Sequence, residues 1–111
     1  MNLDGQYAIA IYNRGNAHFA KVAAMSGDPA RASMLHALMG GRALTAGELA
    51  RAAGIAPQTA SGHLAQMTAL GLLAVEKQGR HRYHRLATPS VARMMESIIQ
   101  VAATLQPERK R

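Results

Sequence analysis

Apolar positions recur at helical spacing in the middle of the chain. Ala60, Leu64 and Met67 stand at i, i+4 and i+7, which places their side chains on one side of a helix. Pro57 suits the first turn because its missing N–H has no partner there, and Gly71 suits the end. The pattern predicts a helix from Pro57 to Leu70.

A shorter helix is predicted just before it. Thr45 and Glu48 have the spacing of a capping box, in which each side chain satisfies a backbone N–H of the other. Leu49 and Ala53 would face inward, and Gly54 would end the helix. Two helices joined by a tight glycine-containing turn are typical of a helix-turn-helix.

The pattern then changes from helical to extended. Leu72 to Lys77 has strand character, and Arg82 to Leu86 can pair with it. The segment Gln78-Gly79-Arg80-His81 between them predicts a short basic turn, and hence a β-hairpin.

Two helices are expected before this motif. The first covers Asn16 to Met25 and ends at Gly27, while residues 1–13 could be an extended arm or the lead-in to that helix. Gly15 disfavours one continuous helix there. The second begins at the capping pair Asp28-Pro29 and ends at Gly40-Gly41, with Leu35, Leu38 and Met39 as its buried stripe.

A last helix is expected from Thr88-Pro89 onward, and its apolar stripe is longer than a small domain edge needs. The same helix of a second subunit is the favoured partner, and a ligand groove lined with Met is the alternative. The predicted dimer interface consists of Phe19, Val22, Val91, Met94, Met95, Ile98, Ala102 and Leu105.

The predicted fold is therefore mainly α with a small β-hairpin, in the order α-α-α-α-β-β-α, forming a dimeric winged helix-turn-helix. The 111 residues suit one domain. We expect an arm and first dimerisation helix at 1–27 and a DNA-binding core at 28–88. A C-terminal dimerisation helix at 89–106 and a basic tail at 107–111 would follow.

The charge favours an anionic partner. Lys and Arg number 13 against 6 Asp and Glu, giving a net charge of +7, and no acidic residue lies between Leu49 and Val75. Double-stranded DNA is the first candidate and an acidic membrane surface the second. The chain has no cysteine, which excludes disulfides and thiolate metal sites. No apolar run approaches about 20 residues and no signal peptide is evident, so a cytoplasmic protein without a membrane partner is expected.

Two surfaces suit DNA. The outer face of the 57–70 helix offers uncharged hydrogen-bonding groups with little bulk, as base edges require; an ordinary solvent face would more often carry Lys and Glu. The predicted base-reading residues are Gln58, Thr59, Ser61, Gly62, His63 and Gln66. The hairpin supplies the residues that are predicted to contact the DNA backbone, which are Lys77, Arg80, His81, Arg82 and Arg85. Protection of a strand edge would explain one or two such charges better than four.

Residues from about 28 to 96 resemble the ArsR-type (ArsR/SmtB) winged-helix repressors. The stretches that carry the resemblance are Leu44-Thr45-Ala46-Gly47-Glu48-Leu49-Ala50, Thr59-Ala60-Ser61-Gly62-His63-Leu64, Leu70-Gly71-Leu72-Leu73 and Gly79-Arg80-His81-Arg82-Tyr83-His84-Arg85-Leu86. The resemblance implies a homodimer whose helices enter successive major grooves, whose hairpins touch the flanks and whose terminal helices form the dimer core. Ser61 and His63 match the family's usual residues, whereas Pro57 and Gly62 depart from them.

The family's metal sites cannot be built here. Their first location reads Arg42-Ala43-Leu44-Thr45 without cysteine, and the segment from Pro89 to Leu105 contains no His, Asp or Cys. The chain has five histidines, His18, His36, His63, His81 and His84. Three could meet across a dimer interface, but a lone histidine is more often a packing or surface residue. No metal or cofactor is expected, and an unknown small-molecule effector stays open.

Catalysis has no support, because no nucleophile–base set or phosphate-binding glycine loop is evident. We therefore expect a sequence-specific DNA-binding regulator, a homodimeric repressor released by an unidentified effector. The alternative is a winged-helix module for protein interaction or for non-specific, architectural DNA binding.

Overall fold

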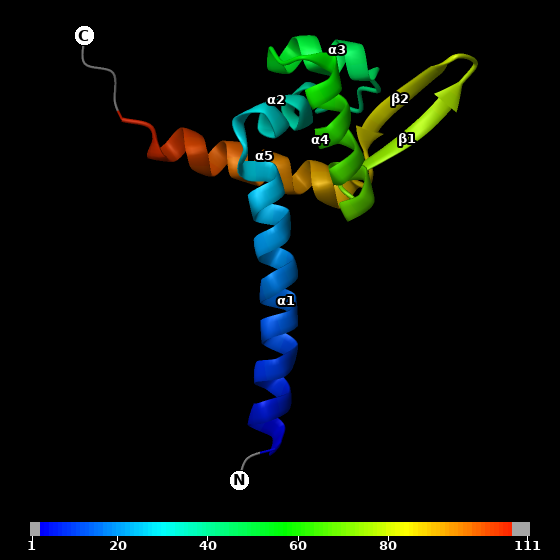
Figure 1. Cartoon of the computed structure of the whole chain (residues 1–111). Coiled ribbons are helices and arrows are strands. Elements are labelled where there is room, and N and C mark those ends of the chain that lie inside the picture. The colour runs from blue at the N-terminus through cyan, green and yellow to red at the C-terminus, as the bar shows by residue number, and fades with distance from the viewer. Residues whose placement is uncertain (1–2, 108–111) are drawn as a thin grey trace.

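The computed structural model describes residues 3–107, with side chains from residue 15 onward. Its elements are α1 (Leu3–Gly27), α2 (Pro29–Ala37), α3 (Ala46–Ala53), α4 (Pro57–Leu70), β1 (Leu73–Gln78), β2 (His81–Leu86) and α5 (Pro89–Leu105). This order of elements is the predicted one (Figure 1).

The capping residues define the starts of α2 and α3. Asp28 accepts a hydrogen bond from the Arg31 N–H at 3.0 Å, which holds the pKa of its carboxyl below the usual range. At α3, the Glu48 N–H donates to Thr45 Oγ1 at 3.2 Å and the Thr45 N–H donates to Glu48 Oε1 at 3.0 Å. The predicted capping box is therefore present. Gly54 ends α3 with a φ of 66°, a conformation that glycine adopts without strain.

The two strands pair antiparallel, from Leu73 opposite Leu86 to Gln78 opposite His81. The turn between them is Gly79-Arg80, and Gly79 has a φ of 60°. A positive φ at the first central position suits a two-residue hairpin turn. A bridge between Leu44 and His84 connects β2 to the loop before α3.

A single core joins α2, α3, α4, β1 and α5. The buried residues are Met34, Leu35, Leu38, Leu49, Ala50, Ala60, Leu64, Met67, Leu72, Leu73 and Met95. The predicted inward face of α4 is confirmed. In α3, Ala50 is buried beside Leu49, whereas Ala53 is only half-buried.

Met95 is a correction to the predicted dimer interface. It is 4% exposed and belongs to the core of its own chain, and Val91 and Met94 pack partly against that core. Helical spacing identified the buried side of α5. It could not say whether the cover comes from the same chain or from another one.

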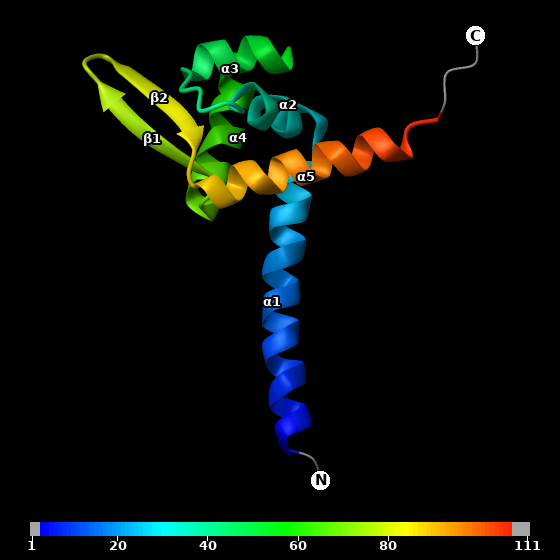
Figure 2. The same cartoon turned by 180° about the vertical axis from the view of Figure 1, so that it is seen from behind.

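The N-terminal segment is a single helix. Residues 3–27 are continuous, so the second of the two possibilities, the lead-in to the helix, is present, while the expected arm and the expected effect of Gly15 were wrong. A helical glycine costs only about 1 kcal/mol relative to alanine, and the alanine-rich sequence after Gly15 favours the helix. Figure 1 and the reverse view in Figure 2 show α1 projecting away from the other elements.

Candidate nucleic-acid interface

The outer face of α4 is low and uncharged. Of the predicted base-reading residues, five are exposed on this helix: Gln58, Thr59, Ser61, Gly62 and Gln66. Ala65 and Ala69 extend the same surface with small side chains. A Cβ added at Gly62 would meet nothing within 4 Å, so packing within the chain does not require glycine there. The missing side chain leaves the backbone open to a close partner.

His63 differs from the other five because it is half-buried at the edge of this face. Its Nδ1 lies 3.2 Å from Nη1 of Arg31, a residue of α2. Sequence reasoning did not identify Arg31, because a contact between residues 32 positions apart has no local signal.

The end of the hairpin concentrates positive charge. Lys77, Arg80, His81 and Arg82 are all exposed. Lys77 and Arg82 stand directly opposite each other on the two strands. Like charges in such a cross-strand pair destabilise a hairpin. An anion bound at this end would remove that repulsion.

Arg85 has a different role from the other hairpin residues that were predicted to contact the DNA backbone. Its Nε donates to Glu76 Oε1 at 2.9 Å, and its Nη1 donates to the carbonyls of Leu86 and Ala87 at 3.2 Å each. The charge of Arg85 is therefore balanced within the chain. Its contacts brace the base of the hairpin, away from the end that carries the free cations.

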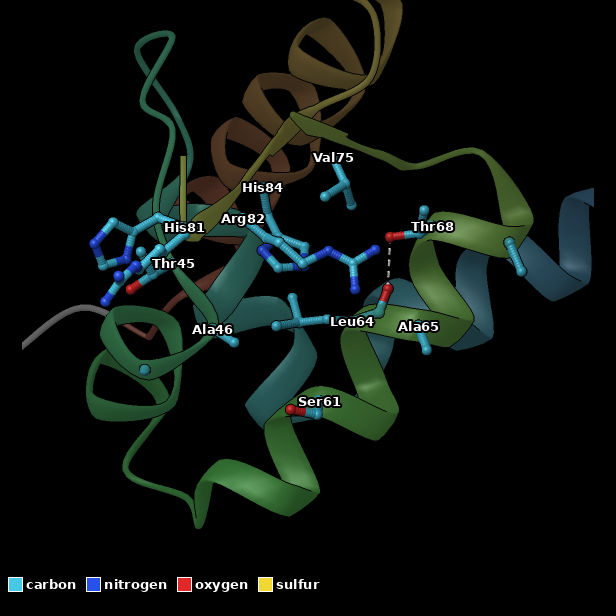
Figure 3. Close-up of a pocket in the computed structure, with 13 residues that line it drawn as sticks. Thr45, Ala46, Ser61, Leu64, Ala65, Thr68, Val75, His81, Arg82 and His84 are labelled. Atoms are coloured by element: carbon cyan, nitrogen blue, oxygen red, sulfur yellow. Dashed lines mark hydrogen bonds between the residues drawn. The ribbon is translucent and has the colours of Figure 1, made fainter. Parts of the chain in front are cut away.

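A groove of about 720 Å³ separates α4 from the hairpin. Ser61, Ala65 and Thr68 form the α4 wall, and Arg82 and His84 are on the hairpin wall. Figure 3 shows the Arg82 side chain extending from β2 into the space beside α4. The N-terminus of α3, with Thr45, Ala46 and Gly47, borders the same groove. Hydroxyl groups thus face a guanidinium group across an open channel.

His84 lies at the inner end of this groove. Its Nδ1 is buried and is without a hydrogen-bond partner among the residues described. Burial lowers the pKa of His84, a hydrogen bond with the Leu44 backbone opposes that shift, and the Arg82 charge adds to it. The groove is therefore lined by two permanent cations, Arg80 and Arg82, and by a histidine, His84, that favours its neutral form.

A separate apolar surface lies where α1 meets α5. Phe19 is 70% exposed, Ile98 46% and Leu105 76%, and Val101, which was not among the predicted interface residues, is exposed as well. A hollow of about 380 Å³ opens between the two helices, lined by Phe19, Val22, Ala23, Ser26, Gly27, Met94 and Ile98. Of the predicted dimer residues, Phe19, Ile98, Ala102 and Leu105 are exposed and Val22 is half-buried.

The described residues contain no cluster of three His, Asp or Glu side chains that could hold a metal ion. Over the same part of the chain, none of the helices combines the length and the apolar character that crossing a membrane requires.

Comparison with known proteins connects this geometry to a family. Residues 27–76 match the family model described as a helix-turn-helix domain. Over 87 residues the chain is 47% identical to the uncharacterized HTH-type transcriptional regulator YdfF of Bacillus subtilis. The match covers 78% of this chain and 38% of YdfF, so the chain spans about two fifths of that relative's length.

Solved structures agree with the fold. The homodimeric winged helix-turn-helix DNA-binding domain of Mb0332 from Mycobacterium bovis, a possible ArsR-family regulator, is 27% identical with a TM-score of 0.72, over 84% of each chain. The antimony-specific transcriptional repressor AntR is 26% identical with a TM-score of 0.64, over 77% of this chain and 79% of AntR. HlyU from Vibrio cholerae shares the fold at 21% identity and a TM-score of 0.72, over 81% of this chain and 94% of HlyU.

Proposed function

This chain carries a helix-turn-helix domain of the winged type found in ArsR-family regulators, and we propose that it binds specific DNA sequences as a homodimeric transcriptional repressor. The observation that carries the proposal is the pairing of two surfaces. An exposed, uncharged face on α4 lies across a groove from a hairpin end that concentrates Lys77, Arg80 and Arg82. Base edges need the first kind of surface and phosphates the second.

In this proposal α4 enters the major groove. Gln58, Ser61 and Gln66 offer donors and acceptors to base edges, and Gly62 lets the helix backbone approach closely. The hairpin follows the adjacent backbone, where guanidinium groups contact phosphates without reading sequence. Arg85 is left out of this interface because Glu76 already balances its charge.

Residues 28–88 would form the DNA-binding unit, and the segments 1–27 and 89–106 would join two copies. The homodimeric Mb0332 domain and the exposed apolar side chains of α1 and α5 support this arrangement.

The absence of cysteine argues against an effector that needs thiolate ligands. A small molecule in the apolar hollow between α1 and α5 would suit release of the repressor, since about 380 Å³ lies within the range of ligand sites. The similar proteins are described as regulators, so we propose no catalytic role for this chain. We also propose that the protein acts in the cytoplasm.

Two sets of substitutions test the docking of α4 and the hairpin. Arg80→Ala with Arg82→Ala should weaken binding to every duplex and reduce the slope of log affinity against log salt by about one for each phosphate that is no longer bound. Gln58→Ala or Ser61→Ala should instead change the preference among sites, by about 1–3 kcal/mol per base contact. The single variants Arg80→Ala and Arg82→Ala would also be compared with Arg93→Ala, which removes one exposed cation from α5 and so changes the net charge by the same amount.

The duplexes would come from fragments that the protein enriches from its own genome, with random duplexes of equal length beside them. A higher affinity for the enriched fragments supports sequence-specific regulation. Equal affinity for both would favour a non-specific, architectural role. Unchanged binding in both sets of variants would mean that the proposed face does not contact DNA.

A further inference from the structure

The Arg31 side chain joins three helices at the edge of α4. Its Nε donates to the carbonyl of Met25 at 2.6 Å and its Nη2 to the carbonyl of Ala24 at 3.3 Å, both in the last turn of α1. Its Nη1 lies 3.2 Å from Nδ1 of His63 on α4. A cation is favoured at the C-terminal carbonyls of a helix. The guanidinium is thus anchored independently of His63 and presents one N–H to the imidazole.

The chemistry of arginine determines the direction of this contact. A guanidinium group has only N–H donors and does not lose its proton in proteins. His63 Nδ1 must therefore be the acceptor and carry a lone pair, which puts the ring proton on Nε2. An imidazolium, or the opposite tautomer, would place two N–H groups against each other.

The second ring nitrogen of His63 reaches the surface. Among the described residues, a single buried side-chain nitrogen or oxygen lacks a hydrogen-bond partner, and it is Nδ1 of a different residue, His84. His63 Nε2 also has no hydrogen-bond partner within these residues. Since it is not counted among the buried atoms, His63 Nε2 must be accessible to solvent. It stands on α4 one turn from the exposed residues Thr59 and Gln66. The N–H at Nε2 is therefore accessible to solvent, and it belongs to a residue at the edge of the face proposed to read DNA.

We propose that Arg31 is a positioning residue that keeps His63 a hydrogen-bond donor toward DNA. This inference rests on the proposed function and adds a specificity rule to it. With its proton on Nε2, His63 selects acceptors such as N7 and O6 of guanine, and it rejects the amino groups of adenine and cytosine. Asp28, the other charged group near the pair, is already occupied in capping α2, where its carboxylate accepts from the Arg31 backbone.

The first test observes the tautomer without DNA. The full chain, labelled with ¹⁵N at histidine, would be examined by NMR at about pH 8, where imidazole is mainly neutral. The expected wild-type spectrum has a protonated Nε2 and an unprotonated Nδ1 for His63. Arg31→Met should move both signals toward the average of the two tautomers, whereas Arg31→Lys, which can still donate, should retain the wild-type pattern. A protonated Nδ1 in the wild type overturns the proposal even if Arg31→Met fails to fold.

The second test separates an effect through His63 from general loosening of the α1–α2 corner. The quantity measured is the ratio of affinities for an enriched duplex and a random duplex. Arg31→Met should lower this ratio about two- to tenfold, the range expected for one hydrogen bond. In a His63→Ala background it should cause no further decrease, because the two residues act as a pair. Arg93→Met, the control for removal of one cation, should leave the ratio unchanged.

An equal decrease from Arg31→Met with and without His63 would assign a merely structural role to Arg31 and overturn the inference. A wild-type ratio of one would instead mean that the proposed function fails. The tautomer result would still stand in that case, because the NMR measurement uses no DNA.

Discussion

At the scale of single residues, the hairpin contains cations and titratable groups in contrasting surroundings. Arg82 extends into the groove, whereas Arg85, three residues later, is paired with Glu76 at 2.9 Å. His84 stands between them with its Nδ1 buried and without a partner in the described chain. Alternation along β2 places Arg82 and His84 on the face that lines the groove and Arg85 on the opposite face. Neighbouring residues of one basic stretch therefore have different chemistry.

His84 predicts a stability change with pH. Burial lowers its pKa from the ordinary value of 6.5, so the unfolded chain takes up the proton before the folded chain does as the pH falls. The stability that the neutral form contributes is complete above about pH 6.5 and is lost as the pH falls toward the lowered folded value. The free energy of unfolding, measured with urea from about pH 5 to 7, should thus depend less on pH in His84→Gln than in the wild type. His36→Gln, at an exposed histidine of α2, is the control, and an unchanged pH dependence in His84→Gln would contradict this account.

Residue-level prediction from the sequence worked where periodicity decides exposure. Ala60, Leu64 and Met67 are buried as their spacing requires, and the residues between them are mostly exposed. It did not find the contact of Arg31 with His63 or the ion pair of Arg85 with Glu76. The first contact depends on how two segments 32 residues apart meet, and the second depends on the register of the hairpin and on side-chain conformation; helical spacing records neither.

At the scale of elements, the two helices of the helix-turn-helix begin differently. Thr45 and Glu48 form a complete capping box at α3. Ala56 stands at the equivalent place before α4, with an extended ψ of 144° and no side chain that can accept from the first N–H groups. Local stability would favour Ser or Asp at this position. The first turn of α4, at the face proposed to contact DNA, therefore has no side chain that caps its free N–H groups.

Substitution of Ala56 should separate stability from DNA affinity. Ala56→Ser and Ala56→Asp should both stabilise the fold, the serine variant by about 0.5–1 kcal/mol, because each supplies the missing acceptor. Ala56→Asp should also weaken DNA binding, since it places a carboxylate among phosphates, whereas Ala56→Ser should change it little. Urea unfolding and DNA titration of both variants would measure the two effects. Unchanged DNA affinity in Ala56→Asp would mean that the start of α4 lies away from the phosphates.

Several element boundaries were predictable because capping residues mark them chemically, but α2 ends at Ala37 and not at the predicted Gly40-Gly41. Asp28-Pro29, Thr45 and Gly54 lie at the helix ends that the structure has. The start of α1 was not predictable in this way. A single glycine penalty at Gly15 is smaller than the summed preference of the residues around it, so a local signal gave the wrong boundary.

At the scale of the whole molecule, the chain is too extended for its own residues to cover all of its apolar side chains. Its radius of gyration is 17.2 Å, against about 13 Å for a compact domain of this length. Figure 1 shows α1 and α5 projecting in different directions from the helix-turn-helix and the hairpin. Phe19, Ile98 and Leu105 lie exposed on these two helices. A second copy that covers them would bury apolar surface and align two DNA-binding units.

A charge placed on this surface should separate the proposed dimer. Ile98→Glu should weaken self-association by about 1.5–3 kcal/mol for each protomer, because a symmetric interface contains the same apolar contact twice. Sedimentation equilibrium would measure the dissociation constant, and affinity for an enriched duplex should fall with it, since one protomer reads only half a site. Gln100→Glu adds the same charge to an exposed position on the polar side of α5 and should leave the dimer intact. If Ile98→Glu were as dimeric as Gln100→Glu, the cover of α1 and α5 would have to be something other than a second copy of the chain.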